Sequence, residues 1–448
     1  MKRCSSISLA ISLLCAGAFA GQRPHYGGTL RVAVREAPSS LDPAGIGAAS
    51  FLTGFVFETL VTLDDRGTPL PHLATSWQAE AGDQRWRFSL RNGVSFNDGS
   101  RLDAGTVAAS LRAANADWKV IAVGDALMIE TASPRPHLPA ELALRSNAIA
   151  RHENGKAVGT GPFLVSQCDP GKHLSLMANE QYWDGRPFLD SVEIDLGKSY
   201  REQSALFDLG KVDVIEIAPE NIHRAEAAGR AVVTSQPSTL MALVFAEPPK
   251  STDETHARSA LAMSIDTAAI NHVVVQDGGE PTGALLPNWL SGYAFAFPSG
   301  KNVDGARREK LLARRLAPWT LRYDPADPVS RVVAERIQLN ARDIGITLQL
   351  AISGASDLNL LEISTSSADP RVQLRELAAA VGLPEPKLTG PSAADLYAAE
   401  KQLLETHQVI PLLHVKSAVS VRANVHGWSY PPSGAWRVED LWLGSEKP

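Results

Sequence analysis

The chain has 448 residues, of which 44% are hydrophobic and 21% charged, and its formal net charge is -6. This length exceeds what one hydrophobic core usually spans, so we expect two or more lobes, and the composition excludes long disordered segments. The negative balance, with only short basic groups such as Arg307-Arg308, gives no reason to expect nucleic acid as a partner.

The first twenty residues have the pattern of a cleaved export signal. The basic pair Lys2-Arg3 precedes an apolar stretch at 7–18 that is short for a membrane span, and Ala18-Phe19-Ala20 has small residues where a signal peptidase cleaves. We therefore expect cleavage after about Ala20 and a periplasmic mature protein. A lipid anchor at Cys15 is not expected, because a bulky Leu stands directly before it.

The mature chain begins with a pattern of strand, corner and helix. Leu30, Val32 and Val34 alternate with more polar residues, which is the period of a strand with one buried face. The Pro-Ser-Ser-Leu-Asp-Pro sequence at 38–43 ends that strand. Apolar residues then recur at helical spacing over 50–63, which predicts a mostly buried helix in which Glu58 is exposed.

Residues 84–100 alternate in the same way around Asn92-Gly93, which predicts a β-hairpin. Asp103 follows as the expected N-cap of a helix over 104–115. Strand-like runs return from 160, where the turn-forming Thr160-Gly161-Pro162 precedes them. Beyond Pro248-Pro249 helices and strands interleave as in an α/β lobe.

Six segments stand out in order along the chain: "YGGTLRVAVREAPSSLDPAG", "WRFSLRNGVSFNDGSRLDAGTVAASLRAA", "GTGPFLVSQCDPGKHLSLMANEQYWDG", "ARSALAMSIDTAAI", "RVVAERIQLNARDIGITLQL" and "YAAEKQLLETHQVIPLLH". They resemble, in the same order, the landmarks of the extracytoplasmic solute-binding proteins of family 5, the peptide- and nickel-binding components of ABC transporters. Each segment alone is unspecific, but together they span nearly the whole mature chain.

The resemblance implies a two-lobed α/β periplasmic-binding-protein fold with mixed sheets, an extra inserted domain and a ligand cleft between the lobes. The expected division assigns 1–20 to the signal peptide, 61–157 to the inserted domain and 241–416 to lobe II. Lobe I is expected to be discontinuous and consists of 21–60, 158–240 and 417–448.

The resemblance also implies which residues contact the ligand. A peptide ligand needs an acid for its amino group and a base for its carboxylate, because a desolvated charge must find a partner. Asp369 and Arg145 are the candidates for these two roles, although Asp369 also fits the N-cap of a helix beginning at Pro370 and Arg145 also fits an exposed surface position. Trp118 is either an apolar wall of the cleft or part of the core. The residues implied as ligand contacts are Ala44, Gly45, Ile46, Gly47, Trp118, Arg145 and Asp369.

The sequence departs from the family where "LEISTSSADPR" has small polar residues in place of the usual aromatic ones, and the chain is short for the family. These departures leave the solute open. Cys168 is the one cysteine outside the leader, so no internal disulfide is expected.

The sequence favours no enzyme, because it has no phosphate-binding loop, nucleophile elbow or HExxH helix. Neither catalytic residues nor a metal site or cofactor are expected. The expected function is a monomeric receptor that binds a small, peptide-like solute and delivers it to the permease subunits of an ABC importer. The alternative is a sensor or interaction module with the same fold.

Overall fold

The computed structural model of the chain describes residues 23–43, 51–153, 155–313, 317–430, 436 and 438–444. The expected signal peptide lies outside these residues. None of the helices among them is long and apolar enough to cross a membrane.

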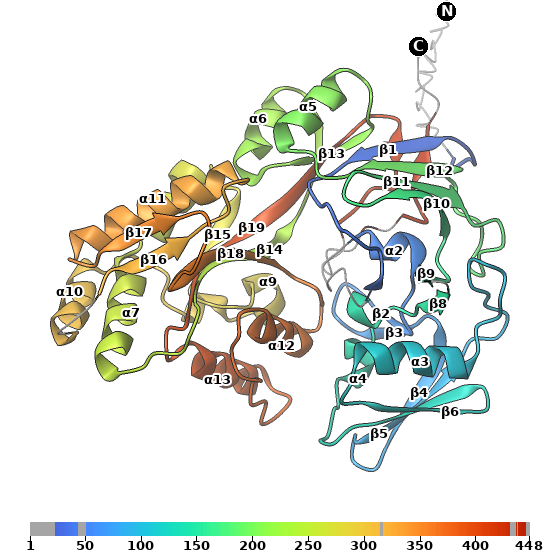
Figure 1. Cartoon of the computed structure of the whole chain (residues 1–448), viewed down its shortest axis with the longest axis horizontal. Helices are drawn as coiled ribbons and strands as arrows, with labels where there is room; N and C mark the ends of the chain where they lie inside the picture. The colour runs from blue at the N-terminus through green and yellow to red at the C-terminus, as the bar shows by residue number, and fades with distance from the viewer. Residues whose placement is uncertain are drawn as a thin grey trace, which may run out of the picture.

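An 11-stranded mixed sheet runs through most of the molecule (Figure 1). In spatial order its strands are β10 (Phe163–Asp169), β11 (His173–Ala178), β12 (Ser191–Asp195), β1 (Thr29–Ala33), β13 (Val214–Ile217), β19 (Val409–Val421), β14 (Ala231–Phe245), β18 (Leu358–Ser364), β16 (Trp319–Arg322) and β17 (Leu348–Ala351), with β15 (Gly279–Pro281) paired to β19. The parallel groups β12–β1–β13 and β18–β16–β17 form its two halves, and the long antiparallel strands β14 and β19 join them.

We use lobe I for the part of the molecule around β1 and β10–β13, and lobe II for the part around β15–β18. Each has its own apolar core, built on Val32, Val192 and Val214 in lobe I and on Leu243, Leu321 and Leu360 in lobe II. The two lobes lie side by side in Figure 1, and β14 and β19 cross between them. The helices of lobe II are α7 (Thr252–Ser264), α8 (Thr267–Ala269), α9 (Asn288–Ser291), α10 (Val303–Leu312), α11 (Pro328–Asp343), α12 (Pro370–Ala380) and α13 (Ala393–Leu404), and those of lobe I are α2 (Thr53–Val56), α5 (Tyr200–Asp208) and α6 (Ile222–Ala227).

A separate four-stranded sheet lies below lobe I in Figure 1, and we call this part the inserted domain. It has its own core, which includes Phe88, Leu111 and Leu127. Its sheet order is β4 (Ala74–Glu80), β5 (Arg85–Leu90), β7 (Ala126–Glu130) and β6 (Lys119–Val123), covered by α3 (Ala104–Ala114) and followed by α4 (Leu138–Glu141) and the 3-10 turn η1 (Arg145–Asn147). Short strand pairs complete the fold: β2 (Val61–Leu63) with β3 (Pro69–Pro71), β8 (Arg151–Glu153) with β9 (Lys156–Val158), and β20 (Val425–His426) with β21 (Trp442–Leu443).

Several sequence predictions are confirmed by these elements. The first strand is β1, and the Asp103 carboxylate accepts a hydrogen bond from the backbone N–H of Thr106 at the start of α3.

Two predictions in the N-terminal part were wrong. The helix predicted over 50–63 ends at Val56, and Glu58 is buried rather than exposed, because its carboxylate accepts bonds from Thr160, Tyr182 and Trp183. The chain does not form a hairpin at Asn92-Gly93 either. β5 pairs instead with β4 before it and β7 after it, because these strands complete the apolar face that packs on α3.

Pro237 lies inside β14 and does not interrupt it. The strand has 15 residues in all, and its pairing with β19 changes register on both sides of the proline. A proline is tolerated at such a bulge because no ladder hydrogen bond requires its missing N–H there.

Candidate ligand-binding cleft

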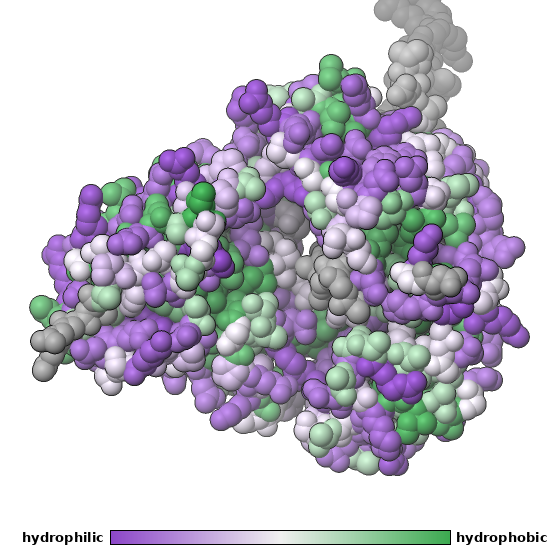
Figure 2. All heavy atoms as spheres, viewed as in Figure 1, coloured by the Kyte–Doolittle hydropathy of each residue, from purple (hydrophilic) through white to green (hydrophobic). Residues whose placement is uncertain are grey.

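A cavity of about 100 Å³ lies where lobe I and lobe II join. It is formed by residues of β13, β14, β18 and β19, the 3-10 turn η2 (Pro219–Asn221) and the segment that begins α11. Figure 2 shows the molecule hollowed between these two parts. The charged and phenolic residues that line the cavity are Arg35, Tyr200, Glu216, Glu220, Asp327, Glu362, Lys416 and Tyr430.

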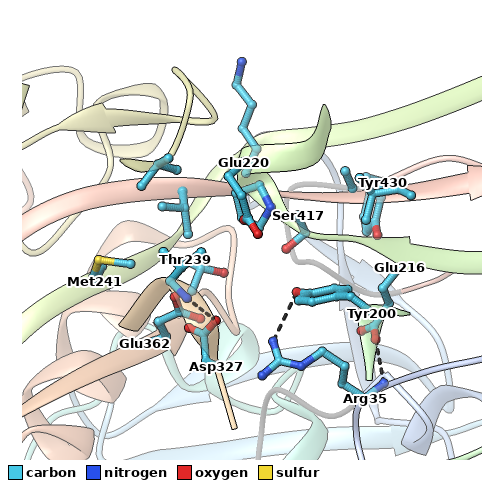
Figure 3. Close-up of a pocket in the computed structure, with 17 residues that line it drawn as sticks. Arg35, Tyr200, Glu216, Glu220, Thr239, Met241, Asp327, Glu362, Ser417 and Tyr430 are labelled. Carbon is cyan, nitrogen blue, oxygen red and sulfur yellow. Dashed lines mark hydrogen bonds between the residues drawn. The ribbon is translucent and has the colours of Figure 1, made fainter. Parts of the chain in front are cut away.

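The lobe I wall is a fixed network of hydrogen bonds around Glu216. This carboxylate accepts the backbone N–H of Arg35 at 2.6 Å and the side-chain amide of Gln203 at 3.0 Å. The Arg35 guanidinium donates to the Tyr200 hydroxyl at 3.1 Å and lies 4.7 Å from the centre of its ring (Figure 3). Because these groups already hold one another, the wall presents a rigid, polar surface.

The lobe II wall carries Asp327 and Glu362, which lie side by side in Figure 3. Asp327 is the N-cap of α11 and accepts the backbone N–H groups of Val329 and Ser330 at 3.1 and 3.3 Å. The side chain of Glu362, on β18, makes no hydrogen bond or ion pair with any of the described residues. One carboxylate on this wall is therefore occupied by the helix and the other is available.

Glu220 faces these acids from η2, on the lobe I side. One of its oxygens accepts from Asn221 at 3.2 Å, and the other is buried without a hydrogen-bond partner among the described residues. Glu220 thus contributes a buried, unsatisfied carboxylate oxygen from one side of the junction, and Glu362 contributes a carboxylate open to the cleft from the other.

Enclosure between the lobes and neighbouring acids shift the pKa values of the residues that line the cavity. Glu362 is open to the cleft, but the walls of the two lobes remove part of its hydration, which raises its pKa to about 7. The nearby negative charge of Asp327 adds to the increase. Burial likewise raises the pKa of Glu220, again with Asp327 contributing. Burial opposes the positive charge of Arg35, but Tyr200, Asp327 and Glu216 raise the pKa of its guanidinium overall.

Trp118 is 7% exposed and packs in the core of the inserted domain. It also borders a second cavity, of about 260 Å³, between the inserted domain and α12. Trp118 therefore belongs to the core of the inserted domain, which is one of the two positions considered from the sequence, and its contact with a solute stays a prediction.

Arg145 begins η1 and is half-buried. Burial lowers the pKa of its guanidinium to about 10, while the negative charge of Glu36 opposes that decrease. Since Glu36 follows β1, the Arg145 side chain interacts with lobe I as well as with its own domain.

Asp369 is the N-cap of α12, and its Oδ1 accepts the backbone N–H groups of Arg371 and Val372 at 2.8 and 3.1 Å. Its Oδ2 lies 3.3 Å from Nδ1 of His137 in the inserted domain. The carboxylate is thus engaged by the helix and by a neighbouring domain. Ala44, Gly45, Ile46 and Gly47 lie outside the described residues.

The sequence did not predict the acids and Arg35 that line the cavity between the lobes, which we call the hinge cavity. Glu216 lies on β13, whose sequence is VIEI, and an acid inside such an apolar strand is a usable signal. Glu220, Asp327 and Glu362 come from three separate elements, and only the sheet order brings them together.

The fold and this junction are those of the class of two-lobed α/β proteins with a cavity between their lobes. The family model for bacterial extracellular solute-binding proteins, family 5 (Middle), matches residues 68–366. The chain belongs to this family.

Individual relatives are more distant. The uncharacterized protein YhjP of Bacillus subtilis is 37% identical over 175 residues, which are 35% of this chain and 30% of YhjP. The nickel-binding periplasmic protein of Escherichia coli is 24% identical over 352 residues, 67% of this chain and 66% of that protein. The chain thus spans less than two thirds of either relative.

The fold extends further than the sequence similarity. The structure of the oligopeptide-binding protein AppA of Bacillus subtilis, in complex with a nonapeptide, superposes with a TM-score of 0.80 at 18% identity. The superposition covers 94% of this chain and 100% of AppA.

Proposed function

We propose that the protein is a periplasmic, monomeric receptor that encloses a small peptide-like solute between its lobes and delivers it unchanged to the permease of an ABC importer. Family membership and the export signal expected at 1–20 support this role. The use of the same fold as a sensor has no observation in its favour.

We also propose the domain division expected from the sequence, with lobe I at 21–60, 158–240 and 417–448, the inserted domain at 61–157 and lobe II at 241–416. The separate cores of the three parts support it. In this division the solute lies against Arg145 and Trp118 of the inserted domain, Ala44, Gly45, Ile46 and Gly47 of lobe I, and Asp369 of lobe II.

The observation that carries the proposed solute class is the pair of carboxylates Glu220 and Glu362 on opposite sides of the hinge cavity. One Glu220 oxygen is buried without a hydrogen-bond partner among the described residues, and the Glu362 carboxylate is open to the cleft. Two acids brought together across a closing cleft repel each other unless a positive group lies between them. An ammonium group of the solute supplies that positive charge and thereby stabilises the closed form of the cleft.

The size of the cavity limits what it holds. A space of about 100 Å³ admits only a few atoms, such as the amino end of an amino acid or short peptide. The remainder of the solute then extends along the cleft, and Arg35 and Lys416 at the same junction offset the acidic charge.

The test combines identification of the solute with one substitution. Native mass spectrometry of the protein isolated from its own periplasm reveals a retained solute, and a pool of dipeptides and tripeptides tests the class by thermal shift. Glu362→Gln is expected to raise the Kd about tenfold or more, because it removes a charge-assisted hydrogen bond. Glu335→Gln, which changes an exposed acid of α11, is the control and leaves binding unchanged.

The pH dependence of binding checks the same assignment. Because the pKa of Glu362 is about 7, its ionised form is lost as the pH falls from 8 to 6, so binding of an ammonium-bearing solute weakens over that range. Glu362→Gln flattens this dependence. A solute without a positive charge, or a Kd independent of pH in the native protein, contradicts the proposed class, and failure to bind any peptide, amino acid, sugar or metal chelate contradicts the receptor role.

A further inference from the structure

The inserted domain touches lobe II at a point remote in sequence and away from the hinge cavity. We call this the α4–α12 contact, and it joins the segment 135–147 to the N-terminal half of α12. In Figure 1 α4 and α12 face each other across the space between the two sides of the molecule, while β14 and β19 connect the lobes at its other end.

The centre of the α4–α12 contact is Glu141, which is only 4% exposed. Its Oε2 accepts a bond at 2.8 Å from Arg135 of its own domain, and its Oε1 accepts one from Arg375 of α12. A buried carboxylate is stabilised only when it is paired, and one of its two partners comes from the opposite lobe.

Two further interactions lie around this ion pair. His137 Nδ1 is 3.3 Å from Asp369 Oδ2, at the start of α12. Val372 packs with Leu63, Ala140 and Leu144 in a small apolar cluster that includes residues of both parts.

The backbones also meet closely near this contact. A Cβ on Gly67 would lie 2.4 Å from the carbonyl oxygen of Ala368, just before α12. The two surfaces therefore fit as a packed interface, with charge at its centre and apolar groups beside it.

We propose that the α4–α12 contact holds the two sides of the cleft closed independently of solute, so that Glu141 and Arg375 set solute affinity without contacting the solute. Because β14 and β19 join the lobes at the hinge, opening the cleft there separates α12 from α4 and removes Arg375 from Glu141. The fraction of molecules in the closed form then scales the apparent affinity for any solute that binds the closed form.

The experiment measures the shape of the solute-free protein by small-angle X-ray scattering at low ionic strength. Arg375→Gln removes the partner from the opposite lobe and is expected to increase the radius of gyration relative to the native protein. Arg135→Gln is the matched control, because it removes the other partner of the same carboxylate but leaves the interaction between the two sides intact. Arg375→Lys, which keeps the charge, is expected to give a smaller increase.

Added salt separates a charge effect from a change in packing. It is expected to shift the native protein part of the way toward the dimensions of Arg375→Gln, because salt screens a largely buried pair only weakly, and to leave that variant nearly unchanged. Circular dichroism confirms that all variants are folded, and Arg375→Lys keeps the test available if Arg375→Gln is not.

The proposal is overturned if Arg375→Gln scatters like the native protein, if Arg135→Gln opens the molecule equally, or if the native protein is already open at low salt. None of these measurements uses a solute. The inference therefore fails or holds separately from the proposed receptor function.

Discussion

The burial of a single residue, His414, makes the stability of the folded protein depend on pH. It is 3% exposed on β19, and its Nε2 lies 2.9 Å from the carbonyl oxygen of Leu285. Burial lowers the pKa of the imidazole to about 4, although the Leu285 carbonyl opposes this, so the ring is neutral in the folded protein at neutral pH.

The sign of the effect follows from the proton balance. Between pH 6.5 and 4 the unfolded chain binds a proton at this histidine and the folded chain does not, so stability falls as the pH falls. The interval corresponds to a loss of about 3 kcal/mol in the free energy of unfolding. His414→Gln keeps a hydrogen-bond donor for Leu285 and is expected to remove this part of the acid sensitivity.

Urea unfolding at pH 7.5, 6, 5 and 4 measures the difference between His414→Gln and the native protein. His272→Gln is the control, since His272 is exposed and pairs only with Asp277 at the surface. Parallel stability curves for the native protein and His414→Gln would show that the histidine is not buried as a neutral ring.

The candidate site shows what could be predicted for individual residues. Asp369 was correctly considered as an N-cap, because the cap depends on the local sequence Asp-Pro at a helix start. The cavity acids could not be predicted in the same way. Glu220 and Glu362 are 142 positions apart in the printed sequence, and their proximity depends on the path of the sheet between them.

The segment that connects β9 to β10 packs so closely on α2 that position 159 requires glycine. A Cβ at this position would lie 1.9 Å from the carbonyl oxygen of Val56, at the end of α2. The segment passes so closely because the backbone N–H of Gly161 bonds to that same oxygen at 2.9 Å. Only a residue without a side chain allows this approach where β9 leads into β10.

Gly159→Ala is therefore expected to destabilise the protein by about 3 kcal/mol, because the backbone of α2 or of the 159–161 segment must move. Gly300→Ala is the matched control, since a Cβ there meets no heavy atom within 4 Å and the backbone is not left-handed. Thermal unfolding compares the two. Equal melting temperatures for both variants would mean that the segment does not lie against α2 in solution.

The elements that could be predicted are those whose ends are marked by the local sequence, such as a helix that begins at a capping residue. α3 and α12 begin at caps that the sequence states directly, whereas the partners of β5 are set by tertiary packing. Asn92-Gly93 has the residues of a hairpin turn, but β4 and β7 bury the apolar face of β5 more completely.

At the scale of the whole molecule, β14 and β19 run through both lobes, and the continuous sheet links the two cores. The inserted domain, by contrast, has a separate sheet and a separate core around Phe88. The resemblance to a family made this two-lobed arrangement predictable, but periodicity alone would not have shown that one strand serves both lobes.

This architecture predicts two units of different stability rather than three. Phe88→Ala, at a position with 0% exposure, is expected to remove about 3–5 kcal/mol from the inserted domain. Hydrogen exchange should then accelerate in β4–β7 and stay nearly unchanged in β14 and β19. Leu243→Ala changes a core residue of lobe II that lies on β14 itself. This variant should accelerate exchange in both lobes, because a shared strand makes them unfold together. If Phe88→Ala accelerates exchange in β14 as much as in β5, the inserted domain and the lobes form one cooperative unit instead.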